Sequence, residues 1–231
     1  SVKELAEIFE LPNSHVCRLL KTLVKTGYLE QDRSRKYQVS AQILCLGNAY
    51  LSRLTVRDKA RPYLYRLHRD MEQKVYMAMN HYGQALIVDV ITASSDGDKA
   101  SMTIGTINPV NTTACGKLCG AYASESEKKN LFATIKKRKY TSKTITSVIQ
   151  LEKEFANILS SGYSVTNFER GNDIFGVAAP VFNCNGVMRA AIGTYTVNPE
   201  LSIVNKNRMI EKTRQCAESV SFALGYLVEN I

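Results

Sequence analysis

Apolar residues near the start of the chain recur at the spacing of an amphipathic helix. Val16, Leu19, Leu20, Leu23 and Val24 follow an i, i+3, i+4, i+7, i+8 pattern, which at about 100° per residue places them on one face. We expect this face to be buried. The opposite face carries no acidic residue and consists of Ser14, Arg18, Lys21, Thr22 and Lys25, with His15 and Cys17 at its margins.

A shorter helix is predicted directly upstream. Ser1 and Glu4 have the spacing of a capping box, in which each side chain accepts a hydrogen bond from the other residue's backbone. Pro12 disfavours a helical conformation at the residue before it, so the two helices are separate. Asn13 or Ser14 can then cap the second helix. We expect Leu5, Ile8 and Phe9 to form the buried side of the short helix.

Two short strands are predicted after the second helix. Gly27 stands where a left-handed residue ends a helix, and segments 28–30 and 36–39 have strand composition around the polar turn 32–35. Two helices followed by a hairpin form a winged helix-turn-helix, whose second helix reads base edges and whose wing contacts phosphates. The candidate DNA-contacting residues are Ser14, His15, Cys17, Arg18, Lys21, Thr22, Lys25, Arg33, Arg35 and Lys36.

The distribution of charge agrees with this interpretation. The chain has a net charge of +9, and residues 1–57 hold nine Lys or Arg against five Asp or Glu. The remaining residues hold 21 basic and 16 acidic side chains over three times that length, so basic density is concentrated at the front, as phosphate contact requires. An amphipathic basic helix by itself is more often a solvated surface. The capped helix before it and the hairpin after it favour DNA.

The rest of the chain predicts an α+β domain with six strands. Ser124 and Glu127 have the spacing of a second capping box, Ser147 with Gln150 is expected to cap a later helix, and Gly162 is expected to end that helix. Pro62 falls in the first turns of one predicted helix and can mark its start, while Lys136–Lys139 is a charge cluster expected to lie in a solvated loop. The expected helices are 40–53, 57–72, 112–123, 124–136, 147–161 and 202–228, and the expected strands are 75–80, 85–90, 100–104, 163–168, 175–182 and 188–197.

Cysteine and histidine usage argues against a metal site, and we expect no cofactor. The six cysteines are scattered, with spacings unlike those of zinc ligands, and the chain has three histidines. A chain of this size can bury a core without disulfides, so we expect reduced thiols and a cytoplasmic protein. There is no apolar stretch of about 18 residues, which predicts no membrane span, and no signal peptide is visible.

Several sequence blocks occur in a specific order: 11–23, 27–29, 37–40, 44–47, 113–117, 162–165, and 177–182 followed by Gly186. In order and spacing they resemble the IclR family of bacterial transcription regulators over nearly the whole chain. The resemblance implies a winged helix-turn-helix over residues 1–39, a linker helix over 40–56 and a GAF-like effector-binding domain over 57–231. The family has a further helix ahead of Ser1, so the first helix of the winged domain is expected to be missing from this sequence.

The resemblance also implies partners. It predicts binding to double-stranded DNA at a palindromic operator, a homodimer that can pair into a dimer of dimers, and a small-molecule effector, often a carboxylate or an aromatic metabolite. Whether the effector releases or recruits the protein stays open. The effector residues carried over from the family are Met102, Asn111, Ala114, Cys115, Thr166, Gly176, Gly193 and Tyr195.

Four of these positions depart from the family. Asn111 replaces a frequent His, and the other three departures point to one change of effector. Thr166 stands where the family often has Asp, Gly176 where it often has Cys, and Tyr195 where small hydroxyl residues are usual. Because a charge is lost while volume and a ring are gained, we expect an effector other than small keto acids such as glyoxylate or pyruvate. The alternative is that these are ordinary strand residues that pack a filled core.

The cysteines leave a second class of function open. Cys115 and Cys119 lie one helical turn apart, so a redox sensor or a thiol-dependent enzyme on the GAF-like domain is the alternative to a regulator. Buried, inert cysteines are the more common case. No arrangement of catalytic residues has convincing spacing, so we expect no enzyme. A protein-interaction module without a DNA role would leave the charges of residues 14–36 unexplained.

Overall fold

The computed structural model describes residues 1–92, 102–134, 139–197 and 199–227. It divides into two compact units, Ser1–Leu54 and Thr55–Ile231, and each has its own hydrophobic cluster. The division falls inside the segment 40–56 that the sequence predicts as a linker. Among the described residues, no helix combines the length and the hydropathy needed to cross a membrane.

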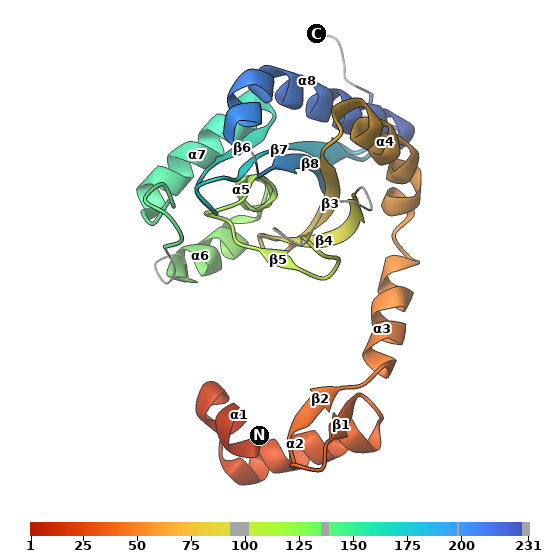
Figure 1. Cartoon of the computed structure of the whole chain (residues 1–231), viewed down its shortest axis with the longest axis vertical. Coiled ribbons are helices and arrows are strands. Elements are labelled where there is room, and N and C mark those ends of the chain that lie inside the picture. The colour runs from red at the N-terminus through yellow and green to blue at the C-terminus, as the bar shows by residue number, and fades with distance from the viewer. Residues whose placement is uncertain (93–101, 135–138, 198, 228–231) are drawn as a thin grey trace. The chain divides into compact units, whose positions relative to one another are not determined.

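The N-terminal unit contains the predicted helices and hairpin in the predicted order (Figure 1). The capping box is confirmed, because the Glu4 backbone N–H donates to Ser1 Oγ at 3.3 Å and the Ser1 amino group donates to Glu4 Oε2 at 2.6 Å. Gly27 has a φ of +80° and follows the second helix. The elements are α1 (Val2–Phe9), α2 (Asn13–Lys25), β1 (Leu29–Gln31), β2 (Tyr37–Val39), antiparallel to β1, and α3 (Gln42–Leu51).

Two expectations for α2 were wrong. Neither Asn13 nor Ser14 caps the helix; Pro12 occupies the N-cap position and no side chain makes a cap hydrogen bond. The apolar face is only partly buried: Val16 and Leu20 are 4% and 6% exposed, whereas three further members, Leu19, Leu23 and Val24, are exposed. The short α1 and the hairpin pack against one side of the helix, so they cover only part of its apolar face.

The buried side expected for α1 is wrong in part. Leu5 packs against the small cluster of this unit, whereas Ile8 and Phe9 are exposed.

The larger unit is an α+β domain, which confirms the predicted class. Its six strands form one antiparallel sheet in the order β5-β4-β3-β8-β7-β6. Its elements are α4 (Thr55–Met71), β3 (Lys74–His81), β4 (Gln84–Ile91), β5 (Ile107–Asn108), α5 (Ala114–Ala121), α6 (Glu125–Thr134), α7 (Val148–Ser161), β6 (Ser164–Asn167), β7 (Phe175–Phe182), β8 (Met188–Thr196) and α8 (Pro199–Ala223).

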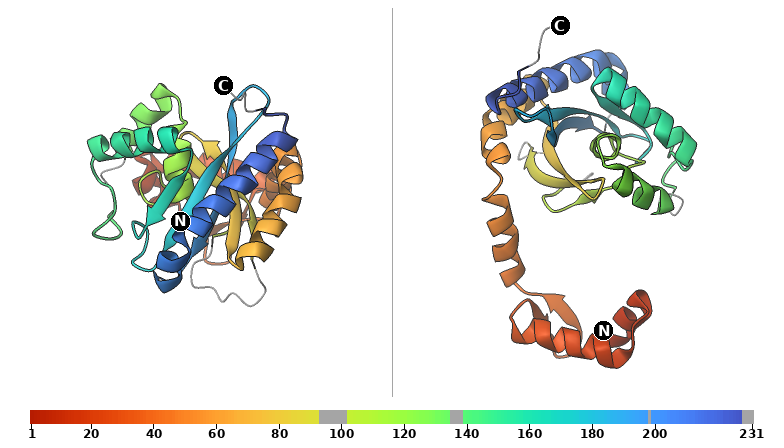
Figure 2. Two further views of the ribbon diagram at one scale, coloured as in Figure 1. Left: turned by 90° about the horizontal axis from the view of Figure 1, so that it is seen from above. Right: turned by 180° about the vertical axis from the view of Figure 1, so that it is seen from behind.

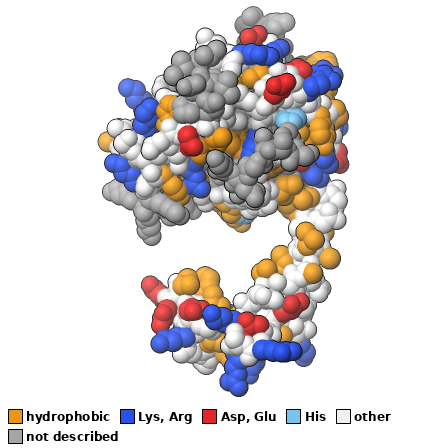
Figure 3. Space-filling view, in the orientation of Figure 1, with side chains coloured by type: hydrophobic (Ala, Val, Ile, Leu, Met, Phe, Trp, Pro, Cys, Tyr) orange, Lys and Arg blue, Asp and Glu red, His pale blue; other side chains and the backbone are white. Residues whose placement is uncertain are grey.

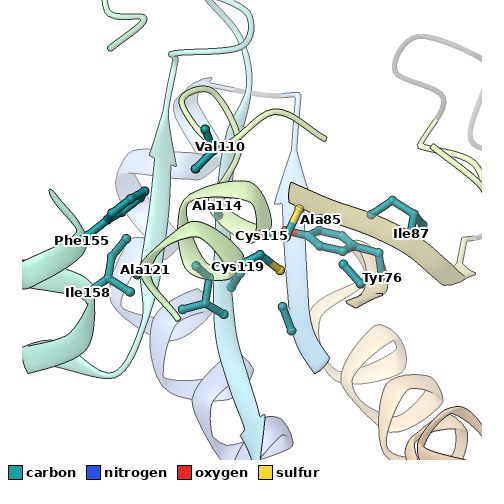
Figure 4. Packing of buried hydrophobic residues seen from close by; sticks show 14 of the residues in the cluster. Tyr76, Ala85, Ile87, Val110, Ala114, Cys115, Cys119, Ala121, Phe155 and Ile158 are labelled. Carbon is teal, nitrogen blue, oxygen red and sulfur yellow. The ribbon is translucent and has the colours of Figure 1, made fainter. Parts of the chain in front are cut away.

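Helices cover both faces of this sheet (Figures 1 and 2). α4 and α8 lie side by side on one face, while α5 packs on the other and is itself contacted by α7. Gly120 allows this contact, because a Cβ atom at that position would lie 2.6 Å from Cζ of Phe155. The core on this side is built mainly from small side chains of α5 and larger ones of β3, β4 and α7 (Figure 4).

Two expectations for the larger unit also fail. The edge strand is Ile107–Asn108, and the described residues 102–104 of the predicted strand 100–104 are not in a strand; residues 100 and 101 lie outside the described residues, as do residues 136–138 of the charge cluster. Pro62 does not mark the start of its helix, since α4 begins at Thr55. Burial of Val56, Ala60 and Leu64 extends the helix through the proline, because packing outweighs one missing N–H donor.

Candidate functional site

The polar face of α2 lies open to solvent. Ser14, His15, Arg18, Lys21 and Lys25 are all exposed. Figure 3 shows Lys and Arg side chains along the outer edge of this unit. Cys17 is half-buried, and the Thr22 hydroxyl donates to the carbonyl oxygen of Arg18 at 3.0 Å. The helix therefore presents basic and hydroxyl groups without a competing carboxylate on this face.

The wing is a tight hairpin with a fixed turn. The Asp32 carboxylate accepts hydrogen bonds from Ser34 Oγ at 2.7 Å and from the Lys36 backbone N–H at 2.8 Å, and these bonds hold the pKa of Asp32 below its usual value. The turn is completed by Arg35, whose φ is +61°. The predicted wing residues Arg33, Arg35 and Lys36 are exposed at its tip.

A cavity of about 360 Å³ lies in the larger unit beside the N-terminus of α5. Thr113 caps that helix, since its hydroxyl accepts from the Gly116 backbone N–H at 3.1 Å. Ala114 follows at the first helical position, where backbone N–H groups and the helix dipole favour an anion. Five of the eight predicted effector residues line the cavity: Met102, Ala114, Thr166, Gly176 and Tyr195.

The sheet register explains why three of these residues meet. Thr166 on β6 pairs with Gly176 on β7, and Gly176 pairs with Tyr195 on β8. The three residues therefore form one row across adjacent strands, with the glycine between two larger side chains. A Cβ atom at Gly176 would lie 3.2 Å from Cβ of Tyr195, so the glycine keeps this wall of the cavity open.

The other three predicted residues lie outside the cavity lining. The Asn111 side-chain amide donates to the carbonyl oxygen of Ile145 at 2.8 Å. Gly193 lies beneath the ring of Tyr76, where a Cβ atom would come within 2.3 Å of Cζ and Oη. Cys115 is fully buried and points from α5 toward Tyr76 (Figure 4).

The two thiols of α5 are poorly suited to redox chemistry. Cys115 and Cys119 are fully buried, and burial raises the pKa of Cys115 and raises that of Cys119 well above the usual value. A thiol reacts as its thiolate, so both are held in the unreactive form. The described part of the chain also contains no cluster of His, Cys, Asp or Glu able to hold a metal ion.

The sequence missed six residues that line the cavity. Thr113 belongs to the sequence block 113–117 that resembles the family, but the sequence does not show that its hydroxyl caps α5 at the edge of the cavity. Arg170 follows β6 in a stretch with no periodicity, so no sequence signal brought it to the site. The missed residues are Tyr76, Thr106, Asn108, Thr113, Arg170 and Ile174.

A larger hollow of about 750 Å³ lies elsewhere in the same unit, against α8 and β7. Its two charged lining residues, Arg214 and Glu218, face each other at 3.7 Å across one helical turn, so their charges offset. The smaller cavity instead combines a helix N-terminus with an arginine. We take the smaller cavity as the candidate effector site for this reason.

Comparisons with known proteins match both units to one family. The IclR helix-turn-helix domain model matches residues 1–33, and the model for the C-terminal part of bacterial transcriptional regulator IclR matches residues 48–222. The glycerol operon regulatory protein of Streptomyces coelicolor is 26% identical over 227 residues, which cover 97% of this chain and 88% of that protein.

Solved structures share the fold. An IclR family transcriptional regulator from Brucella abortus is 25% identical with a TM-score of 0.80, covering 96% of this chain and 84% of that one. An IclR homologue from Microbacterium hydrocarbonoxydans, solved in complex with 4-hydroxybenzoate, has a TM-score of 0.73 at 18% identity, covering 97% of this chain and 90% of that one. These relatives are transcription regulators rather than enzymes. Since the C-terminal model alone spans more than half of the sequence, the chain belongs to the IclR family of bacterial transcription regulators.

Proposed function

We propose that this regulator binds operator DNA through α2 and the wing, and that a small molecule in the cavity beside α5 modulates this binding. The observation that carries the DNA proposal is the exposed basic face of α2 within a unit that matches the IclR helix-turn-helix model. Arg18 lies in the first half of the helix and is suited to base edges, whereas Lys21, Lys25 and the wing residues are suited to phosphates.

The assembly proposed is a two-fold dimer on a palindromic operator. Two copies of α2 would then lie about 34 Å apart, one turn of DNA, or a multiple of that spacing. Dimers can pair further into tetramers. Light scattering on the purified protein, with and without a duplex carrying two half-sites, measures the number of chains that bind.

The effector proposed is a carboxylate with an apolar or aromatic body. The cavity supports this with a helix N-terminus at Ala114 and apolar walls from Met102 and Ile174. A related protein was solved with 4-hydroxybenzoate, which makes that compound a reasonable first probe. The molecular volume of 4-hydroxybenzoate suits a cavity of about 360 Å³ better than the smaller volume of pyruvate does. Calorimetric titration that shows micromolar binding of pyruvate would contradict the proposed class of effector.

The decisive experiment is DNA binding measured by fluorescence anisotropy. The duplex is the region upstream of the chain's own gene, and a coding-sequence duplex of equal length serves as the comparison. We expect preferential, salt-dependent binding to the upstream duplex, weakened by Arg33→Gln, Arg35→Gln and Lys36→Gln combined. Lys153→Gln, which removes an exposed charge from α7, is the control and should leave binding unchanged. Equal binding to both duplexes at all salt concentrations would refute the operator proposal.

A further inference from the structure

The guanidinium of Arg170 contains a buried nitrogen without a hydrogen-bond partner in the described part of the chain. Its Nη1 atom is buried and has no hydrogen-bond partner among the described residues, and the same holds for Oγ1 of Thr166. Both residues line the 360 Å³ cavity, and Thr166 is only 3% exposed. Buried polar groups are nearly always paired, and an unpaired one is costly. Two unpaired groups in one cavity therefore indicate a ligand that completes them.

The acidic residue next to Arg170 is already engaged. Glu169 Oε1 accepts from Nζ of Lys117 at 2.7 Å, and Glu169 Oε2 accepts from the Asn167 backbone N–H. Lys117 also contacts Glu154 Oε1 at 2.9 Å. Among the described residues that line the cavity, none is Asp or Glu. Arg170 therefore has no acidic partner among the described residues that line the cavity.

The loop holds Arg170 in place. Its guanidinium lies over the ring of Tyr140, with Cζ 4.3 Å from the ring centroid, a stacking arrangement that favours arginine over lysine. The backbone just before it is fixed by two hydroxyl groups, because Thr141 Oγ1 donates to the Phe168 carbonyl at 2.8 Å and Thr144 Oγ1 donates to the Glu169 carbonyl at 2.7 Å. A cation fixed in this way needs little reorganisation to bind an anion.

We propose that Arg170 is the residue that selects an anionic effector, by binding its carboxylate in the cavity together with the hydroxyl of Thr166. This deepens the proposed function and rests on it, because it assigns the charge selectivity of the effector site to one side chain. The apolar side chains of Met102 and Ile174 then contact the body of the effector, and Gly176 leaves room for it.

The test is isothermal titration of the full chain with paired probes. Benzoate and 4-hydroxybenzoate are compared with benzamide and 4-hydroxybenzamide, which have the same shape without the charge. We expect binding of at least one acid and none of its amide. Arg170→Gln should lower the affinity for that acid by about tenfold to a hundredfold, the usual range for a hydrogen bond to a charged group. Arg170→Lys should lower the affinity less.

Arg214→Gln in the larger hollow is the matched control and should leave the affinity unchanged. Circular dichroism of each variant shows that the fold is intact. If Arg170→Gln binds the acid as tightly as the unmodified chain, the role assigned to Arg170 is wrong while an effector site remains. If Arg214→Gln is the variant that loses binding, the ligand occupies the larger hollow and the inference is also wrong. Equal affinity for acids and amides, or binding of neither, likewise refutes charge selection by Arg170, whereas the operator proposal is judged separately by the anisotropy experiment.

Discussion

Two glycines that the family resemblance placed in the effector site have different surroundings. Gly176 lines the cavity, and a Cβ atom there would lie 3.2 Å from Cβ of Tyr195, which is closer than ordinary van der Waals contact. Gly193 lies under Tyr76, whose ring already fills the space where a side chain would be. One glycine opens the cavity and the other admits an aromatic ring that forms part of its wall.

Gly193→Ala should destabilise the protein by about 1–3 kcal/mol, because the added methyl group would overlap the Tyr76 ring and approach the carbonyl oxygen of Val177 at 2.7 Å. Urea unfolding followed by circular dichroism measures this. Gly47→Ala is the control: nothing lies within 4 Å of the added carbon in α3, so the same change should stabilise that helix by about 0.5–1 kcal/mol. Equal stability of the Gly193 variant and the unmodified chain would show that Tyr76 moves freely.

Arg18 and Lys25 are both exposed on α2, two helical turns apart, with Arg18 in the first half of the helix and Lys25 at its last position. Arg18→Ala should cost about 1–3 kcal/mol in DNA binding and relax the preference among operator variants, since a base contact is lost. Lys25→Ala should weaken binding to all duplexes alike and lower the magnitude of the slope of log affinity against log salt by about one. Anisotropy titrations over a set of operator variants at several salt concentrations compare the two. Identical profiles would contradict the division between base and phosphate contacts.

At the scale of elements, capping sequences predicted helix starts with unequal success. The sequence Ser124-Glu125-Ser126-Glu127 has the spacing of a capping box, and the box forms: the Glu127 backbone N–H donates to Ser124 Oγ at 3.3 Å, and the Ser124 backbone N–H donates to Glu127 Oε2 at 2.8 Å. Ser147 also occupies an N-cap position, ahead of α7, but its side chain makes no cap hydrogen bond. The same residue type at the same helix position therefore contributes differently.

Ser124→Ala should lower the free energy of unfolding by about 1 kcal/mol, because the hydroxyl that accepts from the Glu127 backbone N–H is lost. Ser147→Ala makes the matched comparison and should cost only a few tenths of that. Thermal unfolding of both variants under one buffer condition gives the difference. A loss at Ser147 as large as the loss at Ser124 would mean that its hydroxyl caps α7 in solution.

At the scale of the whole molecule, the cysteines differ in how far solvent can reach their thiols. Cys45 and Cys184 are exposed, whereas Cys115, Cys119 and Cys216 are buried. Burial raises the pKa of Cys216 to about 12. Because the unfolded chain releases this proton at about pH 8.5 and the folded chain retains it until about pH 12, stability from this group falls as pH rises through that interval.

Iodoacetamide at pH 8 should therefore label Cys45 and Cys184 in the folded protein and leave the buried cysteines unmodified until urea is added. For Cys216 the thiolate fraction at that pH is about a thousandfold below that of an ordinary thiol. Peptide mass spectrometry assigns each modified position. Rapid labelling of Cys115 or Cys119 in the folded protein would restore the thiol-based alternative.

The sequence by itself determined the elements that depend on local rules. Periodicity placed α2 and α4, the Ser1 and Ser124 capping boxes placed two helix starts, and the glycine after α7 placed its end. Each of these signals acts within a few residues, so it can be read without knowing the fold. The resemblance to the family supplied the order of the two units and five of the residues that line the cavity.

Only the tertiary structure decided which faces are covered and which polar groups remain unpaired. It left three members of the apolar face of α2 exposed. It also brought Lys117 to Glu169 across 52 positions, which leaves Arg170 without an acidic partner at the cavity. Contacts between distant segments depend on how the strands pair and on which helix packs over them. The local sequence pattern of a single segment predicts neither the strand pairing nor the helix packing.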